Sequence, residues 1–162
     1  MFYSSLVMNI WNLSIYKYPD SNDTENVKNR IEMYKKMFTI YETIYENGDY
    51  GFDNCRLRQF YGDLAKNYMI INEYENAIDC LEQSAEYAIA FDTLPEIFKH
   101  TSIISAGYTF EKSKDFNKNF DYNESYIVLY DDMAAKHFEP IKDNERFKAI
   151  AAMLKKYAKK EI

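Results

Sequence analysis

The sequence predicts an all-α protein, and three observations support this. The 162-residue chain contains only 4 Gly and 3 Pro, and so few helix breakers favour long helices over a many-stranded β fold. Apolar residues make up 47% of the chain, which is enough to bury a core. In the central part these residues recur at helical spacing. The length suits one domain, which we place over residues 1–162.

The central stretch, residues 64–91, predicts two helices that pack against each other. Its apolar and small residues fall into two groups with helical spacing: Leu64, Ala65 and Tyr68, then Tyr74, Ala77, Ile78, Leu81, Ala85 and Ala88. Between the groups, Ile71, Asn72 and Glu73 are enough to reverse the chain. The stretch therefore predicts an αα-hairpin, in which Ala65 and Ala77 let the two backbones approach closely.

This pattern resembles a tetratricopeptide (TPR) repeat. The positions that match are Tyr61, Leu64, Ala65, Tyr68, Tyr74, Ala77 and Leu81. Ser84 stands where alanine is usual in the repeat, and no proline closes the unit. The resemblance implies a TPR-like right-handed αα-superhelix, which we expect to contain about seven helices around one clear repeat at residues 52–91.

Helices are also expected before this repeat. Residues 2–18 carry an apolar stripe and end before Pro19. Because this first helix is apolar on most sides, we expect a partner in front of it and a longer parent protein. Residues 23–46 form the longest expected helix, with Asn22 as N-cap, Glu25 completing a capping box and Gly48 as C-cap. Its tyrosines, among them Tyr34, Tyr41 and Tyr45, are expected in the core.

After the repeat, Pro95 is expected to open a short helix at residues 96–105. The polar residues 107–124 suggest an irregular loop. Two C-terminal capping helices are expected within residues 125–160. The first, residues 125–136, should turn Ile127, Tyr130 and Ala134 inward, and the second, residues 144–160, should be capped by Asp143.

Charge and cysteine content limit the function classes. The net charge is −6, whereas nucleic-acid-binding modules usually carry a basic face. Two cysteines are too few for a disulfide scaffold, so we expect both to be reduced in a cytoplasmic protein. No stretch approaches the roughly 20 apolar residues of a membrane span. We therefore expect no direct nucleic-acid contact and no membrane association.

Four segments together resemble a narrower family, the C-terminal TPR-like region of Xre-type helix-turn-helix transcriptional regulators from Gram-positive bacteria. The segments are residues 48–52, 64–92, 99–104 and 144–150. The resemblance implies the sensing and dimerisation half of such a regulator. Related regulators carry an N-terminal DNA-binding domain that this sequence lacks, so DNA would be reached only through that domain.

We expect no metal, no cofactor and no enzymatic activity. His100, His137, Cys55 and Cys80 are the soft ligands of the chain, and no two have metal-ligand spacing. No base stands in a recognisable motif with Cys55, Cys80 or a serine. Four scattered glycines do not form a phosphate loop.

A groove for a peptide is the remaining site hypothesis. In a TPR hairpin the first helix faces the concave side, which predicts groove residues about 100° from its core stripe. The candidates are Gln59, Lys66, Asn67, Met69 and Ile70. The amides suit a peptide backbone, Lys66 a carboxylate and Met69 an apolar side chain. The alternative is that this face packs on a neighbouring helix or a second protomer.

The leading functional hypothesis is a non-catalytic peptide-sensing and dimerisation domain of a transcriptional regulator, acting as a homodimer. The alternative is a stand-alone TPR adaptor that binds a partner protein and has no link to transcription. Sequence upstream of Met1 would separate the two.

Overall fold

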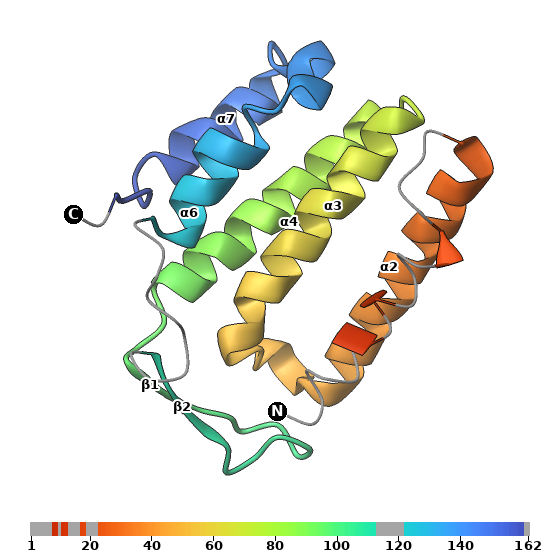
Figure 1. Cartoon of the computed structure of the whole chain (residues 1–162). Coiled ribbons are helices and arrows are strands. Elements are labelled where there is room, and N and C mark those ends of the chain that lie inside the picture. The colour runs from red at the N-terminus through yellow and green to blue at the C-terminus, as the bar shows by residue number, and fades with distance from the viewer. Residues whose placement is uncertain (1–7, 10, 13–16, 19–22, 113–121, 161–162) are drawn as a thin grey trace.

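The computed structural model describes residues 8–9, 11–12, 17–18, 23–112 and 122–160. Its larger helices are α2 (Thr24–Ile44), α3 (Asn54–Ile70), α4 (Tyr74–Asp92) and α7 (Glu145–Leu154). The short helix α6 (Glu124–Ile127) and two strands, β1 (Ile97–Lys99) and β2 (Thr109–Glu111), complete the main elements (Figure 1). The described part is mostly helical, which confirms the predicted class. The expected helix at residues 2–18 lies largely outside the described residues.

The central αα-hairpin is confirmed as α3 and α4. The turn closes with a hydrogen bond of 2.9 Å from the Glu73 N–H to the Tyr68 carbonyl. Asn72 takes a left-handed conformation there, with φ of 62°, which asparagine tolerates better than most residues. Ala65 and Ala77 are fully buried between the helices. Small side chains at this seam therefore permit the close packing that their spacing predicted.

Helix α2 confirms the buried tyrosines but corrects its expected ends. Tyr34, Tyr41 and Tyr45 are all buried. The N-cap is Asp23, whose carboxylate accepts a 3.0 Å hydrogen bond from the Asn26 N–H; Asn22 lies outside the described residues. The helix ends at Ile44, so Gly48 is not its C-cap. Gly48 closes the following 3-10 turn, Glu46–Gly48, with φ of 77°.

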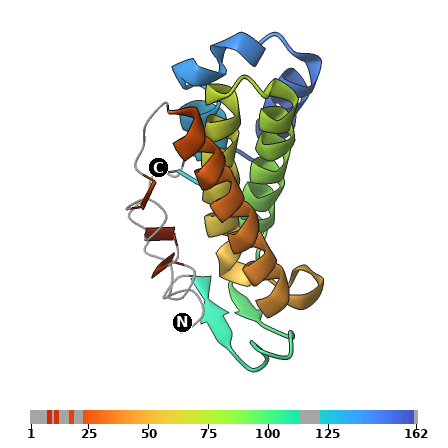
Figure 2. The ribbon, with the colours of Figure 1, turned by 90° about the vertical axis from the view of Figure 1, so that its right-hand side faces the viewer.

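The helix expected at residues 96–105 is wrong, and so is the wholly irregular loop after it. Ile97–Lys99 pairs in antiparallel register with Thr109–Glu111, and Phe98 lies opposite Phe110. Burial alternates with a period of two along this strand: Ile97 and Lys99 are exposed, whereas Phe98 is half-buried and His100 is buried. The residue types do not follow this alternation, because the apolar Ile97 faces solvent. Both views show this hairpin beyond one end of α3 and α4 (Figure 2).

The β-hairpin packs onto the segment that joins α2 to α3. At Gly51 (φ of 52°) a side chain would begin 2.7 Å from the Phe98 ring and 2.9 Å from His100. Glycine is required there for both reasons. The His100 ring also stacks on Tyr45, with 5.2 Å between ring centroids. The hairpin is thus attached through buried aromatic contacts.

The C-terminal helices differ from expectation in their inward face. After α6 the chain forms a π-helical turn at Val128–Asp132 and a 3-10 turn at Lys136–Ile141. The buried residues are Val128, Leu129 and Met133, whereas Tyr130 is 49% exposed. Ile127 and Ala134 are not buried either. The wider π turn rotates the residues after it relative to an α-helical pattern.

Helix α7 begins at the N-cap Asn144, not Asp143. The Asn144 side chain accepts a 2.8 Å hydrogen bond from the Arg146 N–H. The helix ends at Leu154, six residues before the expected end at residue 160. The helix buries Phe147, Ile150 and Leu154, whereas Tyr157, which follows its end, is 38% exposed.

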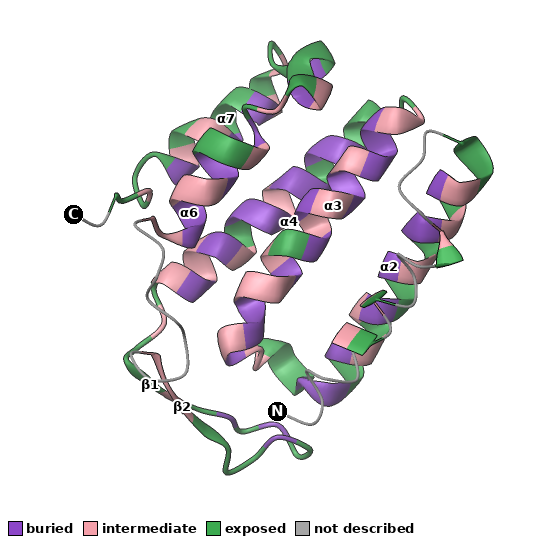
Figure 3. Cartoon of the chain, in the orientation of Figure 1, coloured by how far each residue is buried: buried purple, intermediate pink, exposed green. Residues whose placement is uncertain are grey.

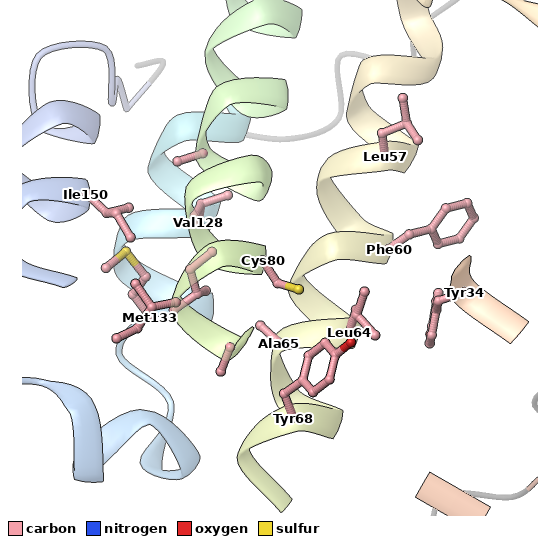
Figure 4. Packing of buried hydrophobic residues seen from close by; sticks show 14 of the residues in the cluster. Tyr34, Leu57, Phe60, Leu64, Ala65, Tyr68, Cys80, Val128, Met133 and Ile150 are labelled. Carbon is pink, nitrogen blue, oxygen red and sulfur yellow. The ribbon is translucent and has the colours of Figure 1, made fainter. Parts of the chain in front are cut away.

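One core joins α2 to α7 through the central hairpin. In Figure 4, Tyr34 and Phe60 meet between α2 and α3, and Ala65 and Cys80 lie between α3 and α4. Val128, Met133 and Ile150 fill the opposite side of α4. Buried and intermediate positions accordingly dominate α3 and α4, while the tip of the β-hairpin is largely exposed except at Ser102 and Ser105 (Figure 3). Among the described helices, none is both long and apolar enough to cross a membrane.

Candidate ligand-binding groove

A pocket of about 430 Å³ lies between α3 and the segment formed by α6 and the π-helical turn. Helix α3 contributes six lining residues, Cys55, Arg56, Arg58, Gln59, Asp63 and Lys66. The facing segment contributes Glu124, Ile127 and Asp132. Its volume is within the usual range for small-molecule sites. Polar and charged side chains dominate this pocket, which we call the α3–α6 groove.

The structure brings two of the five predicted groove residues to this pocket. Gln59 is exposed and Lys66 half-buried at its wall. Asn67 is buried instead, where its amide oxygen accepts 2.8 Å from Arg30 Nε and its nitrogen donates 2.8 Å to the Asp63 carbonyl. Met69 belongs to the core and Ile70 packs against it. Ligand binding by these residues stays a prediction.

An ion network connects the two walls. Arg58 Nε donates to Glu124 Oε2 at 2.7 Å, and Arg58 Nη1 lies 3.3 Å from Asp132 Oδ2. Lys66 Nζ lies 3.3 Å from Asp63 Oδ1 and 3.7 Å from Asp132 Oδ1. Asp132 therefore contacts both cations and holds the facing segment against α3.

The π-helical turn places Asp132 in this network. Its wide hydrogen bond runs from the Met133 N–H to the Val128 carbonyl at 2.9 Å. A turn of this kind inserts an extra residue and re-aims those beside it, and such turns occur frequently at functional sites. Asp132 is the last residue of the turn. The π-helical turn therefore lies at the wall of the pocket.

Burial shapes the ionisation of the pocket. Burial is the main reason why the pKa of Asp63 is raised. The negative charge of Asp132 raises it further, whereas the positive charge of Lys66 lowers it. Burial likewise raises the pKa of Glu124 against the opposing effect of Arg58. Burial also raises the pKa of the Cys55 thiol to about 12. Cys55 is therefore a protonated wall residue, without the thiolate that nucleophilic chemistry needs.

Ser84, which departs from the repeat pattern, contacts the backbone of α3 at a residue that lines the groove. It is fully buried, and its hydroxyl donates a 2.9 Å hydrogen bond to the Arg58 carbonyl. Serine is about as small as alanine, so it fits the helix seam. Its extra hydroxyl links α4 to the part of α3 that carries the network arginine.

A second polar cluster joins two of the segments on which the family resemblance rests. Asp49 Oδ2 accepts hydrogen bonds from the Thr101 N–H at 2.7 Å, the Ser102 N–H at 2.8 Å and the Ser102 hydroxyl at 2.9 Å. His100 Nδ1 lies 3.3 Å from the same oxygen. Because Ser102 donates to Asp49 and not to His100, these residues do not form a Ser–His–Asp relay. The cluster anchors the β-hairpin.

Sequence reasoning missed Arg58, Asp63, Glu124 and Asp132. Arg58 and Glu124 are 66 residues apart, so no local spacing indicates that they meet. Within the described ranges, no group of three His, Cys, Asp or Glu side chains is arranged to hold a metal ion.

Comparisons with known proteins identified no relative of this chain. No protein-family model, no curated protein and no solved structure matches the chain.

Proposed function

We propose that this chain is a non-catalytic binding module that holds a peptide in the α3–α6 groove. The proposal rests on the pocket, whose walls come from α3 and from α6. In a TPR-like array these two helices would line the concave side. Helices α3 and α4 supply one repeat, and α6 with α7 supplies a diverged second. In such arrays the concave face commonly binds extended segments.

The wall residues suit a peptide. Gln59 is exposed, and its amide can both donate to and accept from a peptide backbone. Ile127 and Cys55 offer apolar contact. Lys66, by contrast, already contacts two carboxylates, so a peptide carboxylate would have to compete with Asp63 and Asp132 for it. We therefore place backbone recognition on Gln59 and do not assign a carboxylate to Lys66.

The resemblance to the C-terminal regions of Xre-type regulators supports a sensory role. Filling of the groove would favour one packing of α6 against α3 over another, and a ligand shifts such an equilibrium only by its differential affinity for the two states. The ion network that spans the groove is the contact such a change would break. DNA would be contacted by a separate domain and not by this acidic chain.

Dimerisation belongs to the same proposal. Four large apolar side chains on the β-hairpin and its tip are exposed: Ile97, Ile103, Ile104 and Tyr108. Exposed apolar residues that cluster in this way commonly mark subunit contacts.

The direct experiment is selection of peptides from a random phage-displayed library on the immobilised chain. The affinity of a selected peptide is then measured for the wild type, for Gln59→Ala and for Gln83→Ala. Gln83 is a surface amide on α4 away from the groove. We expect Gln59→Ala to weaken binding about tenfold, since one good hydrogen-bonding side chain contributes about 1 kcal/mol or slightly more. Gln83→Ala should leave the affinity unchanged. An empty selection, or equal loss in both variants, would contradict the proposal.

A further inference from the structure

Asn47 and Gly48 form the one Asn–Gly pair of the chain. They lie in the 3-10 turn Glu46–Gly48 between α2 and α3, and both residues are exposed. Both also take left-handed conformations, with φ of 56° at Asn47 and 77° at Gly48. Glycine and asparagine adopt this conformation at lower cost than other residues. The pair therefore suits the turn, and it also places side by side in the chain two groups that react with each other.

An asparagine followed by glycine is chemically labile. The backbone nitrogen of the glycine attacks Cγ of the asparagine, so that a bond forms between these atoms and the bond from Cγ to Nδ2 breaks. The side-chain nitrogen leaves as ammonia and takes the proton of the attacking N–H. Water then opens the five-membered imide at either carbonyl carbon, which gives aspartate or isoaspartate. Glycine favours the attack because it has no Cβ to obstruct the approach.

The turn leaves this reaction open at Asn47. In the part of the chain that the structure describes, the Asn47 side chain has no hydrogen-bond partner. A long hydrogen bond of 3.2 Å, from the Asp49 N–H to the Glu46 carbonyl, closes the turn. The attack requires rotation about ψ of Asn47 away from its value of 27°. An exposed turn that is held this weakly opens at low cost.

Asn72 is the contrasting case within the same chain. It is also exposed and left-handed, with φ of 62°. The residue after it is Glu73, whose N–H donates a 2.9 Å hydrogen bond to the Tyr68 carbonyl. The Asn72 side chain accepts a 2.9 Å hydrogen bond from the Tyr74 hydroxyl. Both reacting groups are thus engaged at Asn72, although its backbone conformation resembles that of Asn47.

The Asn–Gly pair lies between the two points that hold the β-hairpin. On one side, Asp49 accepts hydrogen bonds from the Thr101 N–H, the Ser102 N–H and the Ser102 hydroxyl. On the other side, the Ser102 hydroxyl lies 3.2 Å from the Glu46 carbonyl oxygen. An isoaspartyl link passes the main chain through Cβ of residue 47 and lengthens it by one carbon. Glu46 and Asp49 would then no longer keep the spacing that Ser102 bridges.

We propose that Asn47 is a site of spontaneous modification, and that its conversion to isoaspartate releases the β-hairpin from the segment between α2 and α3. The inference does not depend on peptide binding in the α3–α6 groove. Its reactants are the two residues and water. The hairpin carries the exposed residues Ile97, Ile103, Ile104 and Tyr108, so the age of the chain would change how this apolar surface is held.

The first test is peptide mapping by mass spectrometry after incubation of the whole chain at mildly alkaline pH, where more of the attacking nitrogen is deprotonated. We expect Asn47 to lose its amide about tenfold faster than Asn72, which corresponds to about 1.4 kcal/mol in activation free energy. Edman degradation of the Asn47 peptide identifies isoaspartate, because the degradation stops at that residue. Equal rates at the two asparagines, or an unchanged Asn47, would overturn the site.

Amide hydrogen exchange measures the consequence. Exchange at residues 97–111 should be about tenfold faster in the incubated chain than in the fresh chain, as expected when a buried hydrogen bond is lost. Exchange in α3 and α4 should not change. Asn47→Gly keeps a residue that accepts the left-handed turn and removes the amide, so its exchange should not change with incubation. A converted chain with unchanged hairpin exchange would overturn the release.

Asn47→Asp separates the new charge from the longer backbone. When freshly purified, this variant carries the negative charge of the product without the additional carbon. Because an exposed charge in a turn is screened by salt, hairpin exchange should stay within about twofold of the fresh wild type. If the fresh variant showed the full increase, the charge would release the hairpin and the role of the isoaspartyl link would be overturned.

Discussion

Asp63 lies between a cation, a second carboxylate and a tyrosine hydroxyl. The Tyr34 hydroxyl donates to its Oδ2 at 3.4 Å, and Lys66 contacts its Oδ1. Burial nevertheless dominates and raises the pKa of Asp63 above its ordinary value. At the residue scale, the groove is therefore a place where ionised carboxylates are held at some cost to stability, as at many functional sites.

This cost predicts a pH-dependent effect of Asp63→Asn. A carboxyl group whose pKa is raised by folding favours the folded state most below its unfolded pKa, here about 3.8, and that contribution is lost as pH rises through the folded pKa. Relative to wild type, Asp63→Asn should therefore be more favourable at pH 7 than at pH 3.5. Urea unfolding at the two pH values measures the difference. If the difference in free energy of unfolding between Asp63→Asn and wild type did not change with pH, the ionised form of Asp63 would not be destabilised by burial.

The elements of this fold are joined by polar anchors as well as by apolar packing. The β-hairpin has two strands of three residues each, which is too little for independent stability. Asp49 holds it through three hydrogen bonds to Thr101 and Ser102. Although burial by itself would raise the pKa of Asp49, these hydrogen bonds and His100 lower it. The carboxylate is thus used in its ionised form.

Asp49→Ala should release the β-hairpin. It leaves the Thr101 and Ser102 N–H groups without their acceptor, and we expect a loss of about 1–3 kcal/mol in the free energy of unfolding. Amide hydrogen exchange should rise at residues 97–111 more than in α3 and α4. Asp143→Ala, at an exposed acidic residue, is the control and should change neither. Unaltered exchange in the hairpin would mean that aromatic packing suffices to hold it.

At the scale of the whole molecule, the proposed ligand groove and the proposed dimer surface lie on different parts of the fold. The groove is built from α3 and α6, whereas the exposed apolar residues belong to the hairpin beyond the end of those helices (Figure 1). The hydrogen-bonded cluster at Asp49 lies between the hairpin and the beginning of α3. A dimer formed through the hairpin would accordingly leave the groove open.

Ile103→Lys tests the dimer. Ile103 is 80% exposed, so a charge there should cost the monomer little, while its burial in an interface would be unfavourable by about 2 kcal/mol or more. Light scattering coupled to size exclusion should then show a wild-type dimer and a largely monomeric variant. Tyr157→Lys, at the C-terminal end, should stay dimeric. A wild type that is monomeric throughout would contradict the proposed dimerisation.

Part of the site was accessible from sequence and part was not. The position of Gln59 and Lys66 follows from the core stripe of α3, because helical geometry places both roughly 140–180° around the helix from Leu57 and Leu64. The sequence places Asn67 and Met69 in the groove as well, but both are buried. Helix α2 reaches Asn67, whose amide oxygen accepts a 2.8 Å hydrogen bond from Arg30. Which neighbour covers a helix face is not encoded in that helix alone.

The sequence by itself determined the helical class, the α3–α4 hairpin and the buried tyrosines of α2, because these depend on the spacing of residues within about twenty positions. Only the tertiary structure decided the β-hairpin, the π-helical turn and the ion network. Arg58 meets Asp132 across 74 residues, and an attraction between charges so distant in the chain leaves no periodic trace in the sequence. The charge balance of the groove exists only once the fold has brought those side chains together.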